Sequence, residues 1–184
     1  MDTTIVVVVI VALVVIALLA FMLLRQRRSQ GLQERFGPEY ERAVERSGDR
    51  RTAESDLSAR ERRRAALDIR ALEPAARDNY LQQWRATQNR FVDDPAGATA
   101  EADELVASVM RERGYPIDDF DQRATDISVD HPRVAESYRE AHAISKANAQ
   151  GLASTDDLRE AFKHYRALFA ELLETETDPR KEAY

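Results

Sequence analysis

The chain has 184 residues and a net charge of −6, a length that suits one ordinary domain with an appendage. The charge is uneven: residues 25–72 carry 13 arginines against 9 acidic residues, whereas residues 73–184 carry 14 basic against 23 acidic residues, an excess that disfavours nucleic-acid binding. The absence of cysteine excludes disulfides, thiolate metal sites, a cysteine nucleophile and a lipoprotein anchor.

The amino-terminal part of the chain predicts a membrane anchor. After a short tail of residues 1–4, residues 5–24 are apolar without interruption, and as a helix they would span about 30 Å, the thickness of a bilayer's hydrocarbon core. A buried core helix would show a polar stripe, and a secretory signal would begin with basic residues and end at a cleavage site. The run has neither pattern, so we expect residues 5–24 to form an uncleaved transmembrane helix in a lipid bilayer.

The residues that flank this run predict its orientation. Arg25, Arg27 and Arg28 follow it directly, whereas Asp2 stands on its amino-terminal side. Because basic residues are retained on the cytoplasmic side, we expect a single-pass protein with its N-terminus outside and its soluble domain in the cytoplasm. The same arginines would meet anionic lipid headgroups. The reverse topology, an envelope protein with the domain outside the membrane, is an alternative.

Residues 25–72 predict a basic juxtamembrane stalk made of helices. Pro38 opens a short helix that Gly48 ends, and Asp49 can cap the next helix, which we expect from about Arg50 to Ala71. That helix has few apolar residues and is expected to attach poorly to any core. It would serve as a stalk, a loose coiled coil or a surface near acidic lipid. Only 3 of the 27 basic residues are lysine, which we interpret as genomic composition.

Residues 73–175 predict a helical bundle. Apolar residues recur at helical spacing throughout, and no strand-like alternation occurs. Pro74 begins the first helix, Asp94 caps the second, and Gly114 ends it.

The last helix of the bundle has the clearest pattern. Ser154 can cap it, and Asp157 three residues later completes a variant of the capping box. Its apolar seam consists of Leu158, Phe162, Tyr165, Phe169 and Leu172. Short connections favour antiparallel neighbours, so the prediction is a four- or five-helix bundle followed by a polar tail at residues 176–184. The whole chain is predicted to be all-α.

The stretch "DISVDHPRVAESYREAH" contains two of the three histidines but is explained by helix initiation. Asp130 can be an N-cap, with Val129 and Val134 as the two halves of a hydrophobic staple. Pro132 would then lie in the first turn, where its missing amide donor costs nothing.

The same stretch supplies the candidate site of an alternative, enzymatic interpretation. Such an enzyme would use a cleft around Asp130, His131, Tyr138 and His142. The two histidines, eleven residues apart, rise by about 16 Å along a helix, which is too far for a shared metal or proton. The sequence also lacks the spacing of known metal-binding and nucleophile motifs. We therefore expect no catalytic, metal-binding or cofactor-binding residues.

Three aromatic residues lie on one stripe of the first bundle helix. Tyr80, Trp84 and Phe91 are separated by helical spacings. Such a stripe most often belongs to the core of a bundle. The alternative is a partner-binding surface, where exposed aromatic residues are enriched.

Four segments resemble a known family. They are "RFGPEYERAVERSGDRRTAESDLSARERR", "RFVDDPAGATAEADELVASVMRERGYP", "DISVDHPRVAESYREAHAI" and "STDDLREAFKHYRALFAELL". Together they resemble an uncharacterised family of bacterial single-pass membrane proteins with a helical soluble domain. The resemblance covers nearly all of the chain after residue 24. It implies bacterial origin and a membrane-tethered helical architecture, and it brings no activity or binding residue with it.

These features together favour a non-enzymatic interaction module over an enzyme. We expect a helical domain, held at the membrane, that presents a bundle surface to a protein partner or to a second copy of itself.

Overall fold

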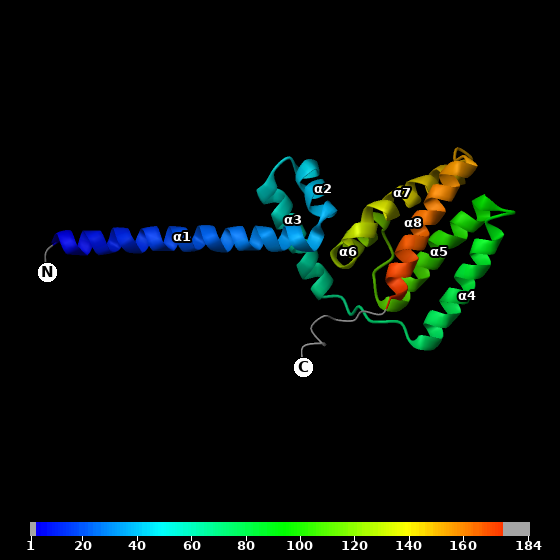
Figure 1. The fold of residues 1–184 in the computed structure, drawn as a ribbon, viewed down its shortest axis with the longest axis horizontal. Coiled ribbons are helices and arrows are strands. Elements are labelled where there is room, and N and C mark those ends of the chain that lie inside the picture. The colour runs from blue at the N-terminus through cyan, green and yellow to red at the C-terminus, as the bar shows by residue number, and fades with distance from the viewer. Residues whose placement is uncertain (1–2, 175–184) are drawn as a thin grey trace. The chain divides into compact units, whose positions relative to one another are not determined.

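The computed structural model describes residues 3–174, except for the side chains of residues 3–9, 11 and 14 (Figure 1). Within that range the chain forms eight helices and no strand, so the all-α prediction is confirmed. Two compact units divide it, residues 1–58 and residues 59–184. The predicted polar tail lies outside the described residues.

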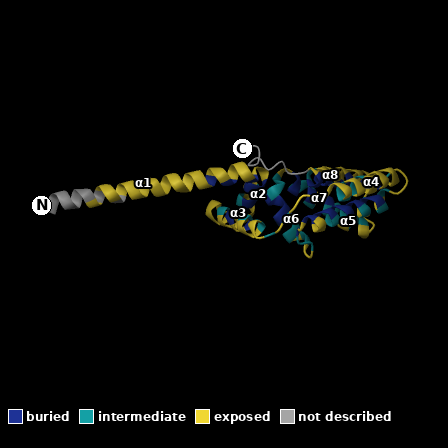
Figure 2. Cartoon of the chain, turned by 90° about the horizontal axis from the view of Figure 1, so that it is seen from below, coloured by how far each residue is buried: buried dark blue, intermediate teal, exposed yellow. Residues whose placement is uncertain are grey.

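The first unit begins with the long helix α1 (Thr3–Phe36), whose apolar part is exposed. The large apolar side chains described between Ile10 and Leu24 are 48–67% accessible, as the exposed colouring along α1 shows (Figure 2). In the described part of the chain, no helix combines the length and apolar character needed to cross a membrane. Seven side chains of the predicted span, at residues 5–9, 11 and 14, lie outside the described residues.

Two further helices complete the first unit. α2 (Pro38–Ser47) and α3 (Arg50–Ala65) are separated by Gly48, whose φ of 67° ends α2 in the left-handed region. Asp49 accepts hydrogen bonds from the amide and hydroxyl of Thr52 (2.8 and 2.7 Å), so the predicted cap of α3 is confirmed. The apolar side chains buried in this unit are Leu32, Phe36, Tyr40, Ala43, Ala53 and Leu57.

Helix α3 differs from its prediction in length and in attachment. It ends at Ala65 rather than near Ala71, and Leu57 is fully buried. Its last two turns belong to the second unit, which begins at Ala59 and not at Glu73 as the division into residues 25–72 and 73–175 predicted. The expectation of poor attachment was wrong, because arginines rather than apolar residues attach this end of the helix.

Those arginines contact α6 (Phe120–Asp130). Arg63 Nε donates to Asp126 Oδ1 at 3.1 Å, and Arg64 donates to Asp130. Arg60 is 5% exposed and its guanidinium lies 3.4 Å from Ser128 Oγ. Burial raises the pKa of Asp126, although its hydrogen bonds with Gln122 and Arg63 act in the opposite direction.

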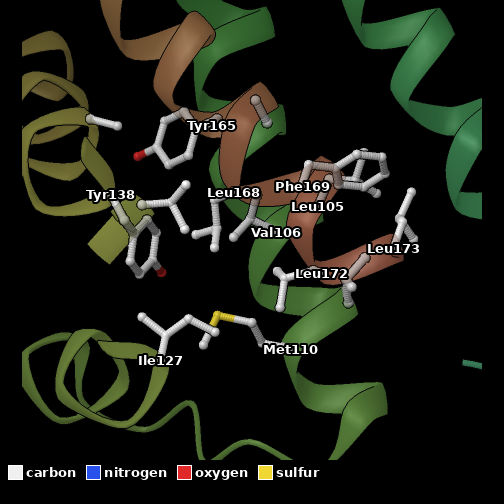
Figure 3. Packing of buried hydrophobic residues seen from close by; sticks show 14 of the residues in the cluster. Leu105, Val106, Met110, Ile127, Tyr138, Tyr165, Leu168, Phe169, Leu172 and Leu173 are labelled. Carbon is white, nitrogen blue, oxygen red and sulfur yellow. The ribbon is translucent and has the colours of Figure 1, made fainter. Parts of the chain in front are cut away.

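The second unit is a five-helix bundle, within the predicted range of four or five. It contains α4 (Pro74–Arg90), α5 (Pro95–Arg113), α6, α7 (Pro132–Ala149) and α8 (Thr155–Leu173). Helix α8 packs against both α5 and α7, and α6 packs against α7. Side chains from these helices meet in one core, in which Val106, Leu168 and Leu172 are fully or almost fully buried (Figure 3).

Most helix ends follow the sequence rules. Asp94 accepts from the amide of Gly97 at 2.9 Å, and Gly114 ends α5 with a φ of 98°. Ser154 and Asp157 form the predicted reciprocal capping box at the start of α8. Local sequence therefore decides where these helices begin and end.

The junction between α6 and α7 differs from its prediction. Asp130 is the last residue of α6, and His131 occupies the cap position between the two helices without a capping side-chain hydrogen bond. The carboxylate of Asp130 instead accepts from Tyr115 Oη at 2.5 Å and from Arg64. These charged and hydroxyl donors compete with the local amides and withdraw Asp130 from the capping role. Pro132 does begin α7, as predicted.

We predict that Phe169→Ala destabilises the second unit by about 3–5 kcal/mol, because it removes a buried ring. The Phe169 ring stacks on Trp84 with 4.6 Å between centroids, and Phe169 is 2% exposed. Urea unfolding followed by circular dichroism would measure the loss. Emission from Trp84, the only tryptophan, would shift to longer wavelength.

Val92→Ala, at a residue that is 82% exposed, is the control and should change stability by less than about 0.5 kcal/mol. Equal urea midpoints for the two variants would contradict this account of the core.

Candidate functional site

The first unit contains a basic hollow at the end of its apolar run. The hollow has a volume of about 460 Å³ and is lined by Phe21, Arg25, Arg28, Arg51, Glu54 and Ser55. The first three of these residues come from α1 and the last three from α3. Two of the three predicted membrane-flanking arginines, Arg25 and Arg28, thus share one site, whereas Arg27 is not among its lining residues.

A network around Glu54 holds α3 against α1. Its Oε1 accepts hydrogen bonds from Ser29 Oγ (2.6 Å), Tyr40 Oη (2.9 Å) and Arg50 Nε (3.0 Å), which come from α1, α2 and α3 respectively. Arg50 also donates to Ser29. Burial alone would raise the pKa of Glu54, but the hydrogen bonds from Ser29, Tyr40 and Arg50 outweigh it and lower that pKa. Glu54 is therefore a carboxylate whose charge is compensated within the protein.

The lining arginines differ in how far the protein engages them. Arg28 Nη2 donates to Ser58 Oγ at 3.0 Å, which places its guanidinium across the α1–α3 contact. Arg25 and Arg51 are exposed and make no side-chain hydrogen bond or salt bridge with another described residue, although the hydrogen bonds from Thr52 and, more weakly, the charge of Arg51 lower the pKa of Asp49. Both guanidiniums can therefore turn toward an anion in the hollow.

A second and larger hollow adjoins the first. It has a volume of about 950 Å³ and shares Phe21, Arg25 and Glu54 with the first. Leu18 and Met22 extend its lining along the apolar part of α1, and both are exposed. Cationic and apolar side chains therefore lie side by side on this part of the first unit.

The residues that α3 contributes to this site were not predicted from the sequence. Arg50, Arg51 and Glu54 lie in a helix interpreted as a solvated stalk, and nothing in their local spacing indicates a partner on α1. The signal that could have found them is the turn at Gly48 and Asp49, because a short connection after a short helix returns the chain toward α1.

The four residues of the alternative enzyme site contact two different sets of neighbours: Asp130 and His131 have one set, and Tyr138 and His142 have the other. Asp130 bonds Tyr115 and Arg64. His131 Nδ1 lies 3.0 Å from Glu171 Oε2, beside a hollow of about 200 Å³.

The other two residues of that site belong to a different cluster. Tyr138 is fully buried and contacts Phe120 and Tyr165, and burial raises the pKa of its hydroxyl. His142 stacks on Phe120 at 3.6 Å between centroids, with its Nδ1 3.6 Å from Asp103 Oδ2. The Tyr138 hydroxyl and Asp103 Oδ1 have no hydrogen-bond partner in the described part of the chain.

The three stripe aromatics belong mainly to the core. Trp84 is 6% exposed and stacks on Phe162 and Phe169, and Phe91 also packs against Phe162. Tyr80 is half-buried and donates to Glu112 at 2.7 Å, and burial, together with this contact, raises the pKa of Tyr80 to about 12. Of the two interpretations, the core one fits Trp84, because α8 covers its ring.

The structure describes no group of three or more His, Asp or Glu side chains in a metal-binding arrangement. This holds for residues 3–174 without the side chains of residues 3–9, 11 and 14, which are not described.

We predict that Glu54→Gln loosens the first unit, because a neutral amide weakens three hydrogen bonds to a charged acceptor. The expected loss is about 1 kcal/mol, seen as roughly fivefold lower hydrogen-exchange protection in α2 and α3. Glu45→Gln, on the exposed face of α2, is the control and should leave protection unchanged.

The lowered pKa of Glu54 also sets a pH window for the first unit. Its contribution is fully present above its ordinary pKa of 4.5 and is lost as the pH falls through the lower folded-state pKa. Protection corrected for intrinsic exchange should therefore decline with acid in the wild type and decline less in Glu54→Gln. The same acid dependence in both proteins would contradict the role of this carboxylate.

Comparisons with known proteins assign no family, so the resemblance to bacterial single-pass membrane proteins stays a prediction. No protein-family model matches the chain, and neither a curated protein nor a solved structure is significantly similar to it.

Proposed function

We propose that this protein is a membrane-anchored, non-enzymatic interaction module. The observation that carries the proposal is the junction in α1 where exposed apolar side chains end at Leu24 and basic residues begin at Arg25. Residues 5–24 insert in the bilayer as a single-pass helix. The helical bundle of the second unit then presents its surface to a protein partner or to a second copy.

Three observations support the anchor. The described side chains from Ile10 to Leu24 are exposed, and an exposed apolar surface of this length costs free energy in water. Within this run, the side chains that the structure does not describe are those of Ile5 and six valines. The apolar sequence is therefore continuous. Arg25, Arg27 and Arg28 then follow directly and favour a cytoplasmic location of the bundle at a bacterial inner membrane.

The end of the bundle supports the interaction role. In the described part of the second unit, Val92 and Leu152 are the large apolar side chains that are exposed, at 82% and 74%. Val92 lies in the α4–α5 turn and Leu152 in the α7–α8 turn, and beside these turns Asn148 of α7 donates a 3.2 Å hydrogen bond to the carbonyl oxygen of Ala96 in α5. We call Val92 and Leu152 the apolar tip. Since Trp84 is buried, the apolar tip is the surface we assign to the partner.

The non-enzymatic part of the proposal is supported by the division of the candidate catalytic residues. Asp130 and His131 have one set of partners, and Tyr138 and His142 have another. Turnover of a substrate that is lost in His131→Gln or His142→Gln without loss of folding would favour the enzymatic alternative.

We predict that the chain resists alkaline extraction from bacterial membranes. Leu13→Arg with Ile16→Arg should abolish this resistance, because each arginine in the middle of a span costs about 2.5–3.5 kcal/mol on insertion scales. Gln30→Arg, on the same helix beyond the apolar run, is the control and should stay in the membrane. Release of the wild-type chain by alkali would contradict the anchor. Activity of a periplasm-only reporter fused after Tyr184 would contradict the orientation.

We predict that Val92→Ser with Leu152→Ser lowers in-cell crosslinking of the bundle to its partner or to a second copy. Both side chains are exposed, so the urea midpoint should stay the same. Thr155→Ser with Ala153→Ser, near the same turn, is a matched control that leaves the apolar tip intact. Unchanged crosslinking in the tip variant would remove the apolar tip from the proposal.

A further inference from the structure

We propose that the basic hollow of the first unit binds the phosphodiester headgroup of an anionic phospholipid. Arg25, Arg28 and Arg51 supply the cationic groups, and Leu18 with Met22 supplies the surface for the acyl chains. The inference rests on the proposed membrane anchor and goes beyond it, since it assigns a specific lipid-binding site rather than a general attraction to the membrane.

Charge favours an anion in this hollow. Three arginines and one glutamate line it, and Glu54 already accepts hydrogen bonds from Ser29, Tyr40 and Arg50. The lining arginines are therefore not neutralised by the glutamate. Guanidinium groups bind phosphate oxygens through paired hydrogen bonds, which gives such a site geometric preference as well as charge.

The arrangement around the hollow favours a lipid over free phosphate. The adjoining hollow continues from Phe21 and Arg25 to Leu18 and Met22, which are 58% and 67% exposed. Inorganic phosphate would leave these apolar side chains uncovered. An acyl chain attached to the same phosphate would cover them, so one ligand satisfies both parts of the surface.

The position of the arginines along α1 agrees with the depth of a lipid headgroup in the membrane. Leu24 ends the apolar run, and Arg25 and Arg28 follow one and four residues later on α1. At about 1.5 Å per residue, both lie within roughly 6 Å of the hydrocarbon boundary, which is the thickness of a headgroup layer. Arg51 on α3 then approaches the same layer from the second helix of the site.

The test uses the full chain in a neutral detergent, titrated with dioctanoyl phosphatidylglycerol and followed by native mass spectrometry. Arg25→Gln with Arg51→Gln should weaken binding by about 30-fold, from about fivefold for each charge removed. The matched control, Arg27→Gln with Arg62→Gln, removes two charges from the same helices outside the hollow and should change binding by less than about threefold.

A second variant changes the site without removing an arginine. Ser55→Glu adds a carboxylate to the lining at an exposed position and should also weaken phosphatidylglycerol binding. Circular dichroism should show unchanged helix content in all variants. Phosphatidylcholine with the same acyl chains should bind at least about tenfold more weakly, because its choline cation meets the arginines.

Other outcomes of these titrations would contradict the proposal. Equal binding of phosphatidylglycerol and phosphatidylcholine, or equal losses in the site and control variants, would exclude a specific headgroup site. Inorganic phosphate that competes as well as the lipid would exclude the acyl-chain part. Alkaline extraction separates these results from failure of the anchor, since the Arg25 and Arg51 variant should stay in the membrane whether or not the lipid site exists.

Discussion

The first unit depends on one carboxylate that three helices share. The apolar side chains that α3 buries in the first unit are Ala53 and Leu57, so apolar burial alone attaches this helix weakly. Glu54 compensates by accepting hydrogen bonds from Ser29, Tyr40 and Arg50, one donor from each helix of the unit. Bonds to an ionised acceptor are stronger than neutral ones and require defined positions of all partners. The convergence of Arg25, Arg28 and Arg51 on one hollow follows from that arrangement.

Arginine has a structural role in the second unit as well. Arg113 is 2% exposed and donates to the carbonyl oxygens of Leu172 (2.9 Å) and Arg70 (3.1 Å), while Arg77 donates to that of Leu173 (3.0 Å). The last carbonyls of α8 lack partners within the helix, so these guanidiniums satisfy groups that would otherwise be buried without hydrogen bonds. Genomic composition alone therefore does not account for the arginines, because at these positions lysine offers fewer fixed donors.

The parts of the fold that sequence predicted are those decided within a few residues. Asp49, Asp94 and the Ser154–Asp157 pair cap helices because their acceptors and amides are three residues apart. Asp130 has an equally suitable local sequence, yet Arg64 and Tyr115 engage it from 66 and 15 residues away. The candidate site could not be predicted for the same reason. Ser29 and Glu54, which form a hydrogen bond, are 25 residues apart in the sequence, and no local pattern indicates that pairing.

The polar sequence of α3 suits a helix beside a lipid surface. An amphipathic helix with a broad apolar face partitions into the interface, where lipid competes with its protein partners. In α3 a charged side chain makes the attachment at both ends, through Glu54 with Ser29 and Tyr40 near its start and through Arg63 with Asp126 near its end. Lipid acyl chains cannot replace these partners. Under the proposed anchoring, a polar α3 keeps its contacts in water while Arg51 still faces the headgroups, a combination that an apolar helix at this position would lose.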